Sequence, residues 1–346
     1  MKTQSKLYFY FIISVVLLAI LAVLALNTGV YDFGGKAPFK VLWQFVKGDP
    51  NLSLSNKYVI WDVRAARIVM AMLIGSMLAV SGTGLQGLFK NPLATGDLIG
   101  LTSGATLLAA IAIVLGGHFR QYLPEAVQFS LVSIAAFIGA FLSMMLVYRI
   151  STSGGKTNVV MMLLTGVAIT AIGFSITGFL IYISKDEQLR DLTFWNLGSL
   201  AAATWTKNIV LAVVMLISYI ILLPKGKALN AMMLGEKDAQ HLGISVERLK
   251  KQIIVITALM VGSSVAFSGT IGFVGLIVPY ILRLVFKSDY TFILPLSAVC
   301  GSILLLTADT FSRSIVEPSE LPIGILTALM GGPIFIAILI KHKRSL

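Results

Sequence analysis

Long apolar stretches without charged side chains recur along the whole of this 346-residue chain. The hydrocarbon core of a bilayer is about 30 Å thick, and a helix needs about 20 apolar residues to cross it. Nine stretches lack Asp, Glu, Lys and Arg and are close to or above that length: 7–30, 68–89, 98–118, 126–148, 157–184, 208–224, 252–282, 290–308 and 321–340. Lipid offers no partner to unpaired backbone groups, so each stretch should be helical. The pattern predicts an all-α polytopic membrane protein.

The seventh stretch, 252–282, has 31 residues and is longer than one crossing needs. Its middle, 268–275, holds three glycines and two hydroxyl side chains, a composition that favours a turn. If the stretch crosses twice, the chain has ten transmembrane helices and both termini share a side. If it crosses once, the termini lie on opposite sides.

The basic residues favour the ten-helix topology. With the N-terminus inside, ten helices place 16 of the 27 Lys and Arg residues on the inner side, with 5 of the 15 acids. Lys and Arg concentrate in cytoplasmic loops near helix ends. Nine helices would instead put Lys341, Lys343 and Arg344 outside, directly after a helix. We therefore predict one transmembrane domain, 1–346, with ten helices and both termini cytoplasmic.

Composition supports a multi-pass protein of the cytoplasmic membrane. Hydrophobic residues make up 57% of the chain and charged residues only 12%, whereas soluble domains carry about 25% charged residues. The net charge of +12 follows from the inner loops and needs no nucleic-acid partner. Because the first apolar stretch exceeds the roughly 7–15 residues of a signal-peptide core, we expect it to be an uncleaved helix.

Catalytic and metal-binding motifs are absent from the sequence. His118, His241 and His342 are far apart and lack the spacing of metal ligands. The segment Ser-Gly-Gly-Lys-Thr at 153–157 lacks the first glycine of a phosphate-binding loop and follows no predicted strand. We expect no catalytic residue, metal or cofactor in this chain, so ATP and Mg²⁺ would bind to another subunit if transport is ATP-driven.

Three segments between the predicted helices have distinct character. An outer loop spans 31–61, and the uncharged, aromatic segment 192–206 fits an amphipathic helix at the outer interface. The inner segment 229–248 mixes apolar and charged residues, and Gly235 and Gly243 are natural helix ends. It predicts two short cytosolic helices that a soluble partner could grip, although an ordinary solvated loop is the alternative.

Charged and small residues cluster at two further places. Arg64 and Arg67 are three residues apart and share one helix face at the outer mouth; simple snorkelling to the interface is the alternative. Arg313 lies on the same side, among outer acids. Gly100 and Gly104, with Ser103 between them, would allow close contact between helices.

Six motifs in order resemble the permease family of iron–siderophore and cobalamin ABC importers over residues 60–340. They are Arg-Ala-Ala-Arg at 64–67, Asn-Pro-Leu-Ala at 91–94, Gly-Leu-Thr-Ser-Gly at 100–104, Leu-Gly-Glu at 234–236 with Leu-Gly at 242–243, Gly-Phe-Val-Gly at 272–275 with Val-Pro at 278–279, and Glu-Leu-Pro-Ile-Gly at 320–324. The chain departs from the family pattern at Tyr280, where His is usual, and at Thr95-Gly96, where Asp-Pro is frequent.

The resemblance implies a pore of two identical or related permeases, two cytosolic ATPases and an extracytoplasmic binding (lipo)protein. It implies that Arg64, Arg67 and Arg313 dock the binding protein. The positions that match the ATPase contact are Leu234, Gly235, Glu236, Ala239, Leu242 and Gly243. Small or flexible residues of the third and fifth helices are candidates for the pore or gate: Gly100, Ser103, Gly104, Thr157, Asn158, Thr165 and Gly166.

Together these features predict the permease subunit of an ATP-driven importer of ferric siderophores, working by alternating access. Cobalamin or haem import is the alternative within the family. An ion-coupled secondary transporter would need ionisable residues at the bilayer midplane, and the sequence places every charged residue at or near the end of a stretch. An intramembrane enzyme would need a nucleophile, acid pair or metal cluster, and the sequence offers none.

Overall fold

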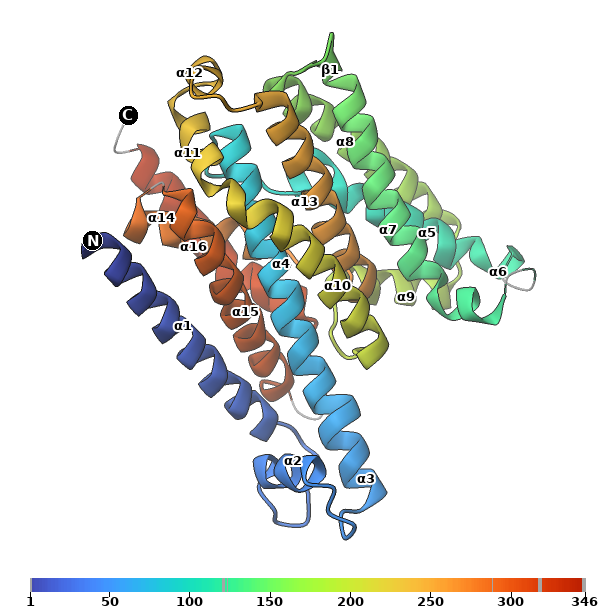
Figure 1. Ribbon diagram of the computed structural model, residues 1–346. Helices are drawn as coiled ribbons and strands as arrows, with labels where there is room; N and C mark the ends of the chain where they lie inside the picture. Colours follow the sequence, from blue (N-terminus) through green and yellow to red (C-terminus); the bar gives the residue numbers. More distant parts are fainter. Residues whose placement is uncertain (1, 120–121, 123, 288, 317–318, 344–346) are drawn as a thin grey trace.

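The computed structural model describes residues 2–119, 122, 124–287, 289–316 and 319–343, and these are mostly helical (Figure 1). A short hairpin of two-residue strands, β1 (Thr152–Ser153) and β2 (Lys156–Thr157), lies between the helices. The α-helices are α1 (Lys2–Asn27), α2 (Pro38–Val46), α3 (Leu54–Lys57), α4 (Ala66–Phe89), α5 (Leu101–Val114), α6 (Gly116–Phe119), α7 (Glu125–Ile150), α8 (Val159–Ile183), α9 (Asp186–Leu197), α10 (Trp205–Leu222), α11 (Gly226–Leu234), α12 (Glu236–His241), α13 (Val246–Ser268), α14 (Val274–Phe286), α15 (Tyr290–Ser314) and α16 (Ile323–Lys343).

Seven helical segments of the described chain are long and apolar enough to cross a membrane. Three shorter apolar helices accompany them, namely Leu101–Val114, Val274–Phe286 and Ile323–Ala337. Figure 1 shows the first turn of α1 and the last turn of α16 at the end of the bundle that carries α11 and α12. The count of ten crossings and the assignment of this end to the cytoplasm stay predictions. Arg344, part of the basic cluster on which the topology rests, lies outside the described residues.

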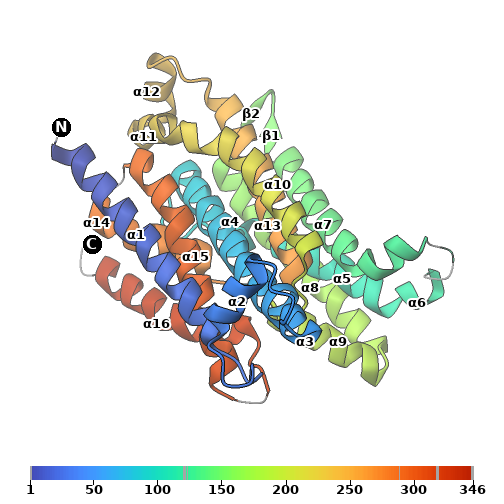
Figure 2. The same ribbon diagram turned by 60° about the horizontal axis from the view of Figure 1, so that its bottom comes forward.

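Helix α4 lies at the centre of the bundle, between α15 and α13 (Figure 2). All but two of its 24 residues are buried. Glycines let its neighbour approach closely: a Cβ on Gly75 would lie 2.3 Å from the carbonyl oxygen of Gly301, and a Cβ on Gly301 would lie 2.2 Å from that of Gly75. Helices α1, α8 and α10 instead leave most of their apolar surface uncovered by this chain.

The outer segment 31–61 is more helical than the sequence predicted. It contains α2, and from Leu54 the chain forms one continuous helix to Phe89 through a π-helical segment, Tyr58–Ala65. Ser53 caps this helix by accepting a hydrogen bond from the N–H of Asn56. With 36 residues and a rise of about 1.5 Å per residue, the helix is about 54 Å long and exceeds the bilayer core. The outer part of this helix contains the charged residues Lys57, Asp62 and Arg64. The pattern of charge-free stretches therefore did not predict it.

The predicted interfacial helix 192–206 is wrong in its bounds. Helix α9 covers Asp186–Leu197, and its first turn contains the acids Asp186 and Glu187, which the positive end of a helix dipole favours. Gly198 ends α9 with a φ of 72°, and Thr204 caps the next long helix, α10. The aromatic segment therefore divides between two helices and the turn that joins them.

The predicted break in the seventh stretch is confirmed. Helix α13 ends at Ser268 and α14 begins at Val274. Gly269 has a φ of 69°, and a Cβ there would lie 2.1 Å from the carbonyl oxygen of Trp195. Only glycine fits this position, because a side chain would collide with the backbone of α9.

The third apolar stretch, 98–118, is not one helix. The one-turn helix Asp97–Ile99 is followed by Gly100 with a φ of 80°, then by α5 and by the short α6. Helix α5 has 14 residues, so it is only about 21 Å long and cannot cross a bilayer core of about 30 Å. Residues 90–100 therefore re-enter the bundle from the end of α4 before α5 begins.

Candidate coupling and docking sites

The segment expected to contact an ATPase forms the two short helices that the glycine pattern predicted. Gly235 separates α11 from α12 with a φ of 151°, and Gly243 follows α12 with a φ of 81°. Leu234 is 70% exposed and Leu242 is 65% exposed, whereas Ala239 is buried. Leu234 ends α11 and Leu242 directly follows α12, so each presents an exposed apolar side chain, and Ala239 anchors α12 to the bundle.

Lys250 joins this segment to two other parts of the chain. Its Nζ donates to Glu236 Oε2 at 2.9 Å and to Glu247 Oε1 at 3.0 Å. It also donates to the backbone carbonyl of Thr157 at 2.8 Å, and the N–H of Thr157 donates to Glu247 Oε2 at 2.9 Å. Lys250 itself is 1% exposed. We call these four residues the Lys250 junction; it connects α12, α13 and the hairpin before α8.

The hairpin at this junction explains the glycine-rich segment 153–157. Gly154 and Gly155 have φ values of 57° and 74°, as the two central residues of a type I′ turn require. Asn158 then caps α8, because its side chain accepts hydrogen bonds from the N–H groups of Val160 and Met161. The segment is thus a turn and a helix start rather than a phosphate-binding loop.

Sequence reasoning missed Lys250, although a signal was present. Glu247 and Lys250 are three residues apart at the start of a helix, a spacing that lets opposite charges pair. Glu236 and Thr157 were candidates for different roles, coupling and gating, and the junction brings them together.

The other gate candidates mostly make close contacts between helices. A Cβ on Gly104 would lie 2.5 Å from the carbonyl oxygen of Gly139, and one on Gly166 would lie 2.4 Å from that of Leu98. The Gly100 carbonyl accepts hydrogen bonds from the hydroxyls of Ser103 and Ser143, at 3.1 Å and 2.6 Å. Thr165 is buried and lies near Ser151, with 3.5 Å between the hydroxyls. These residues hold α5 and the preceding turn against α7 and α8.

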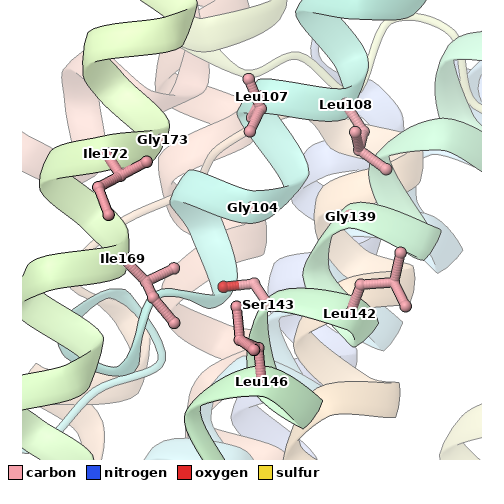
Figure 3. A pocket seen from close by; sticks show the side chains of 10 residues that line it. All are labelled: Gly104, Leu107, Leu108, Gly139, Leu142, Ser143, Leu146, Ile169, Ile172 and Gly173. Atoms are coloured by element: carbon pink, nitrogen blue, oxygen red, sulfur yellow. The ribbon is translucent and has the colours of Figure 1, made fainter.

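A hollow of about 250 Å³ opens beside these contacts, between α5, α7 and α8 (Figure 3). Leucine and isoleucine side chains border it, and Ser143 supplies the one polar side chain of its lining. Because the Ser143 hydroxyl donates to the Gly100 carbonyl, its proton is already used within the chain. The Ser143 oxygen, as an acceptor, is therefore the one polar side-chain group that this lining offers a ligand.

The three outer arginines are buried inside the subunit. Arg64, Arg67 and Arg313 are 4%, 6% and 8% exposed. Arg67 donates from Nε to Asp309 Oδ1 at 2.9 Å and from Nη1 to both carboxylate oxygens of Glu320 at 2.8 Å. Arg313 Nε lies 3.3 Å from Asp309 Oδ2. We call these four residues, Arg67, Asp309, Arg313 and Glu320, the outer charge network.

Arg64 has a different set of partners. Its guanidinium donates to the carbonyls of Leu26, Gly29 and Tyr31 at 2.9–3.1 Å and lies over the ring of Phe33. It thus ties the segment after α1 to the central helix. These arginines are not unpaired charges at the surface, and they do not simply extend to the membrane interface. Each of them already has partners within the chain. Their role toward a binding protein stays a prediction.

Comparisons with known proteins establish the class of this chain. A family model described as the FecCD transport family matches residues 17–341. The hemin transport system permease protein HmuU of Yersinia pestis is 36% identical over 99% of this chain and 98% of its own length. The vitamin B12 import system permease protein BtuC of Vibrio vulnificus is 35% identical over 95% of both chains.

The fold agrees with that class. A solved structure described as an inward-facing, metal-chelate type ABC transporter has a TM-score of 0.82 and 31% identity, and the match covers 96% of this chain and 99% of that one. The chain is the permease subunit of an ABC importer. It belongs to the FecCD transport family, whose multi-span membrane permeases work with ATPase and binding-protein partners and are not themselves enzymes. Membership of this family excludes the two alternative classes, an ion-coupled secondary transporter and an intramembrane enzyme.

Proposed function

We propose that this chain carries ferric siderophores across the cytoplasmic membrane by alternating access. Two identical or related permeases would enclose the path, two cytosolic ATPases would bind ATP and Mg²⁺, and an extracytoplasmic binding protein would deliver the chelate. The likeness to a metal-chelate type transporter supports this cargo. The proposed mechanism rests on the Lys250 junction.

The Lys250 junction would transmit a movement of the ATPase to the transport path. The exposed leucines Leu234 and Leu242 give a partner an apolar surface to cover. When the ATPase pair closes, it would displace α11 and α12 together with Glu236. Since Glu236 shares Lys250 with the Thr157 carbonyl, the displacement would reach the hairpin and the first turn of α8. Charge-assisted hydrogen bonds are roughly twice as strong as neutral ones, which suits a mechanical link.

Glu236→Arg tests the proposal in the purified complex reconstituted in vesicles. The new cation would face Lys250, so we expect chelate uptake to fall by about tenfold while ATP hydrolysis continues, a change worth about 1.4 kcal/mol. Lys237→Gln is the matched control, because Lys237 is exposed on the same helix. Normal uptake by an assembled Glu236→Arg complex would show that the junction does not couple the two activities.

Haem or cobalamin is the second candidate cargo. It is favoured by the named relatives, a hemin permease and a vitamin B12 permease at 36% and 35% identity. The three cargoes can be separated by uptake assays with a ferric trihydroxamate, haemin and cyanocobalamin in the same vesicles. Saturable uptake of haemin or cobalamin alone would replace the siderophore proposal.

A further inference from the structure

Asp97 lies at an unusual depth for a charged residue. It belongs to the segment between α4 and α5 that re-enters the bundle. A Cβ on Gly96 would lie 3.4 Å from Val261, which is well inside α13, and the Leu98 carbonyl packs against Gly166 of α8. A small hollow beside Asp97 is also lined by Leu78, midway along α4 between Arg67 and Lys90. These neighbours place Asp97 near the middle of the membrane.

This placement corrects one prediction from the sequence. Asp97 directly precedes an apolar stretch, so it was expected at an inner helix end. The re-entrant segment carries it instead to the depth where α5 begins. Irregular backbone at this depth is tolerated only where it is buried in protein or lines a water-filled cavity. A carboxylate facing lipid there would also be costly.

Three hydroxyl side chains and a small, otherwise largely apolar hollow lie beside Asp97. Asp97 is exposed in this subunit, and its neighbour Leu98 is 40% exposed. Its Oδ1 accepts a hydrogen bond from the hydroxyl of Thr102. The hollow beside it, about 30 Å³ in volume, is also lined by Ser81 and Thr95; it is large enough for a water molecule and too small for a chelate. One side of Asp97 therefore remains uncovered by this subunit.

We propose that Asp97 lines the transport path and selects cargo by charge. Its carboxylate would favour a chelate that carries an ammonium group or other N–H donors and disfavour an anionic one. A permease pair would present two such carboxylates to the same path. This inference rests on the proposed import of ferric siderophores and adds to it the class of siderophore, cationic rather than anionic.

Cysteine accessibility tests the position of Asp97 without any transport. Asp97→Cys in a Cys300→Ser background is reacted with a membrane-impermeant cationic thiol reagent in the full complex. Ile20→Cys is the control, because Ile20 is an exposed apolar residue of α1 that should face lipid. We expect position 97 to react at least about tenfold faster, since thiolates form in water and not in lipid. Equal, negligible labelling at both positions would overturn the proposal.

A matched pair of cargoes tests the charge selection. The probes are a linear ferric trihydroxamate with a free ammonium group and the same chelate after acetylation of its amine. We expect the wild type to prefer the cationic form and Asp97→Asn to lose that preference by roughly five- to tenfold, as removal of a nearby opposite charge predicts. Asp186→Asn on α9 is the control. If the wild type carries neither chelate, the proposed cargo is wrong. If it carries them and Asp97→Asn keeps the same preference, only the role of Asp97 is wrong.

Discussion

Ion pairs stand at both ends of the bundle, and they differ in how far water reaches them. In the outer charge network, Asp309 is fully buried and pairs with Arg67 and Arg313, both largely buried. In the Lys250 junction the cation is buried, but the carboxylate side chains of Glu236 and Glu247 are 43% and 33% exposed. Water is excluded from the Asp309 pairs and reaches the outer charge network only at Glu320, whereas both carboxylates of the Lys250 junction are partly exposed.

This difference indicates different roles. Breaking a buried pair leaves a charge without solvent and is strongly destabilising, so the outer charge network should stay formed through a transport cycle. In the Lys250 junction Glu236 can exchange Lys250 for water, because buried Lys250 would keep Glu247 and the Thr157 carbonyl as partners. The Lys250 junction can therefore open and close as α12 moves. The Arg67–Asp309 pair joins α4 to α15, and we expect the Lys250 junction, rather than this pair, to rearrange during transport.

The largest effect is expected from Asp309→Ala. The change leaves Arg67 and Arg313 side by side without their shared carboxylate. We expect the complex to lose about 3–5 kcal/mol of stability, measured by thermal unfolding in detergent and by yield. Asp186→Ala, an exposed acid on α9, should change little. If Asp309→Ala were as stable as the wild type, the outer charge network would not hold the two helices.

Lys250→Met should mainly affect coupling. Methionine keeps the apolar length of the side chain but deprives the Thr157 carbonyl and two carboxylates of their donor. We expect a stability loss of about 1–3 kcal/mol, with uptake reduced more than ATP hydrolysis. Lys251→Met is the neighbouring control. Equal loss of both activities would indicate a folding defect rather than a broken link.

Glu320→Gln sharpens the docking hypothesis for the outer end. Glu320 is the exposed member of the outer charge network, with 42% of its side chain accessible, so its removal should cost only about 0–1 kcal/mol of stability. If Arg67 docks a carboxylate of the binding protein, the variant should bind that protein more tightly at low salt. Asp62→Asn, an exposed change on the helix that carries Arg67, is the control.

Unchanged or weaker affinity in Glu320→Gln would argue against docking at Arg67. The double variant Arg64→Glu with Arg67→Glu is a less clean test. Because both positions are buried, the new acids would disturb folding together with any docking.

An effect of similar size to that of Glu320→Gln is expected at Asp289, which caps α15. Burial alone would raise the pKa of Asp289, but hydrogen bonds from Thr291 and Asn230 outweigh it and hold this pKa below its ordinary value. A lowered pKa means that the stabilisation is complete above the unfolded-state pKa and is lost as pH falls through the folded-state pKa.

Two substitutions at Asp289 separate its charge from its capping. Asp289→Ala should cost about 1 kcal/mol at neutral pH, as loss of an N-cap does. Asp289→Asn should keep the cap and remove this part of the acid dependence, measured by thermal unfolding between neutral pH and about pH 2, because the unfolded-state pKa of Asp is about 3.9. An unchanged acid profile in Asp289→Asn would assign that dependence to other carboxylates.

The sequence by itself determined most of the long apolar helices and where several of them end. Crossing a bilayer demands about 20 apolar residues, so the stretches could be read directly. Glycine and hydroxyl residues marked the break between α13 and α14, and Gly235 marked the break between α11 and α12. These are local properties, since propensity and turn chemistry act over a few residues. The ordered motifs also sufficed to identify the family.

The tertiary structure decided which charges meet and how deep each one lies. Arg67 pairs with Asp309, 242 residues away in the chain, and Lys250 reaches the carbonyl of Thr157, 93 residues away. Asp97 borders an apolar stretch in the sequence yet lies beside Leu78 of α4 and Val261 of α13, because the chain turns back into the bundle before α5. Pairing and depth depend on how distant helices pack against one another, and no local pattern of residues encodes that packing.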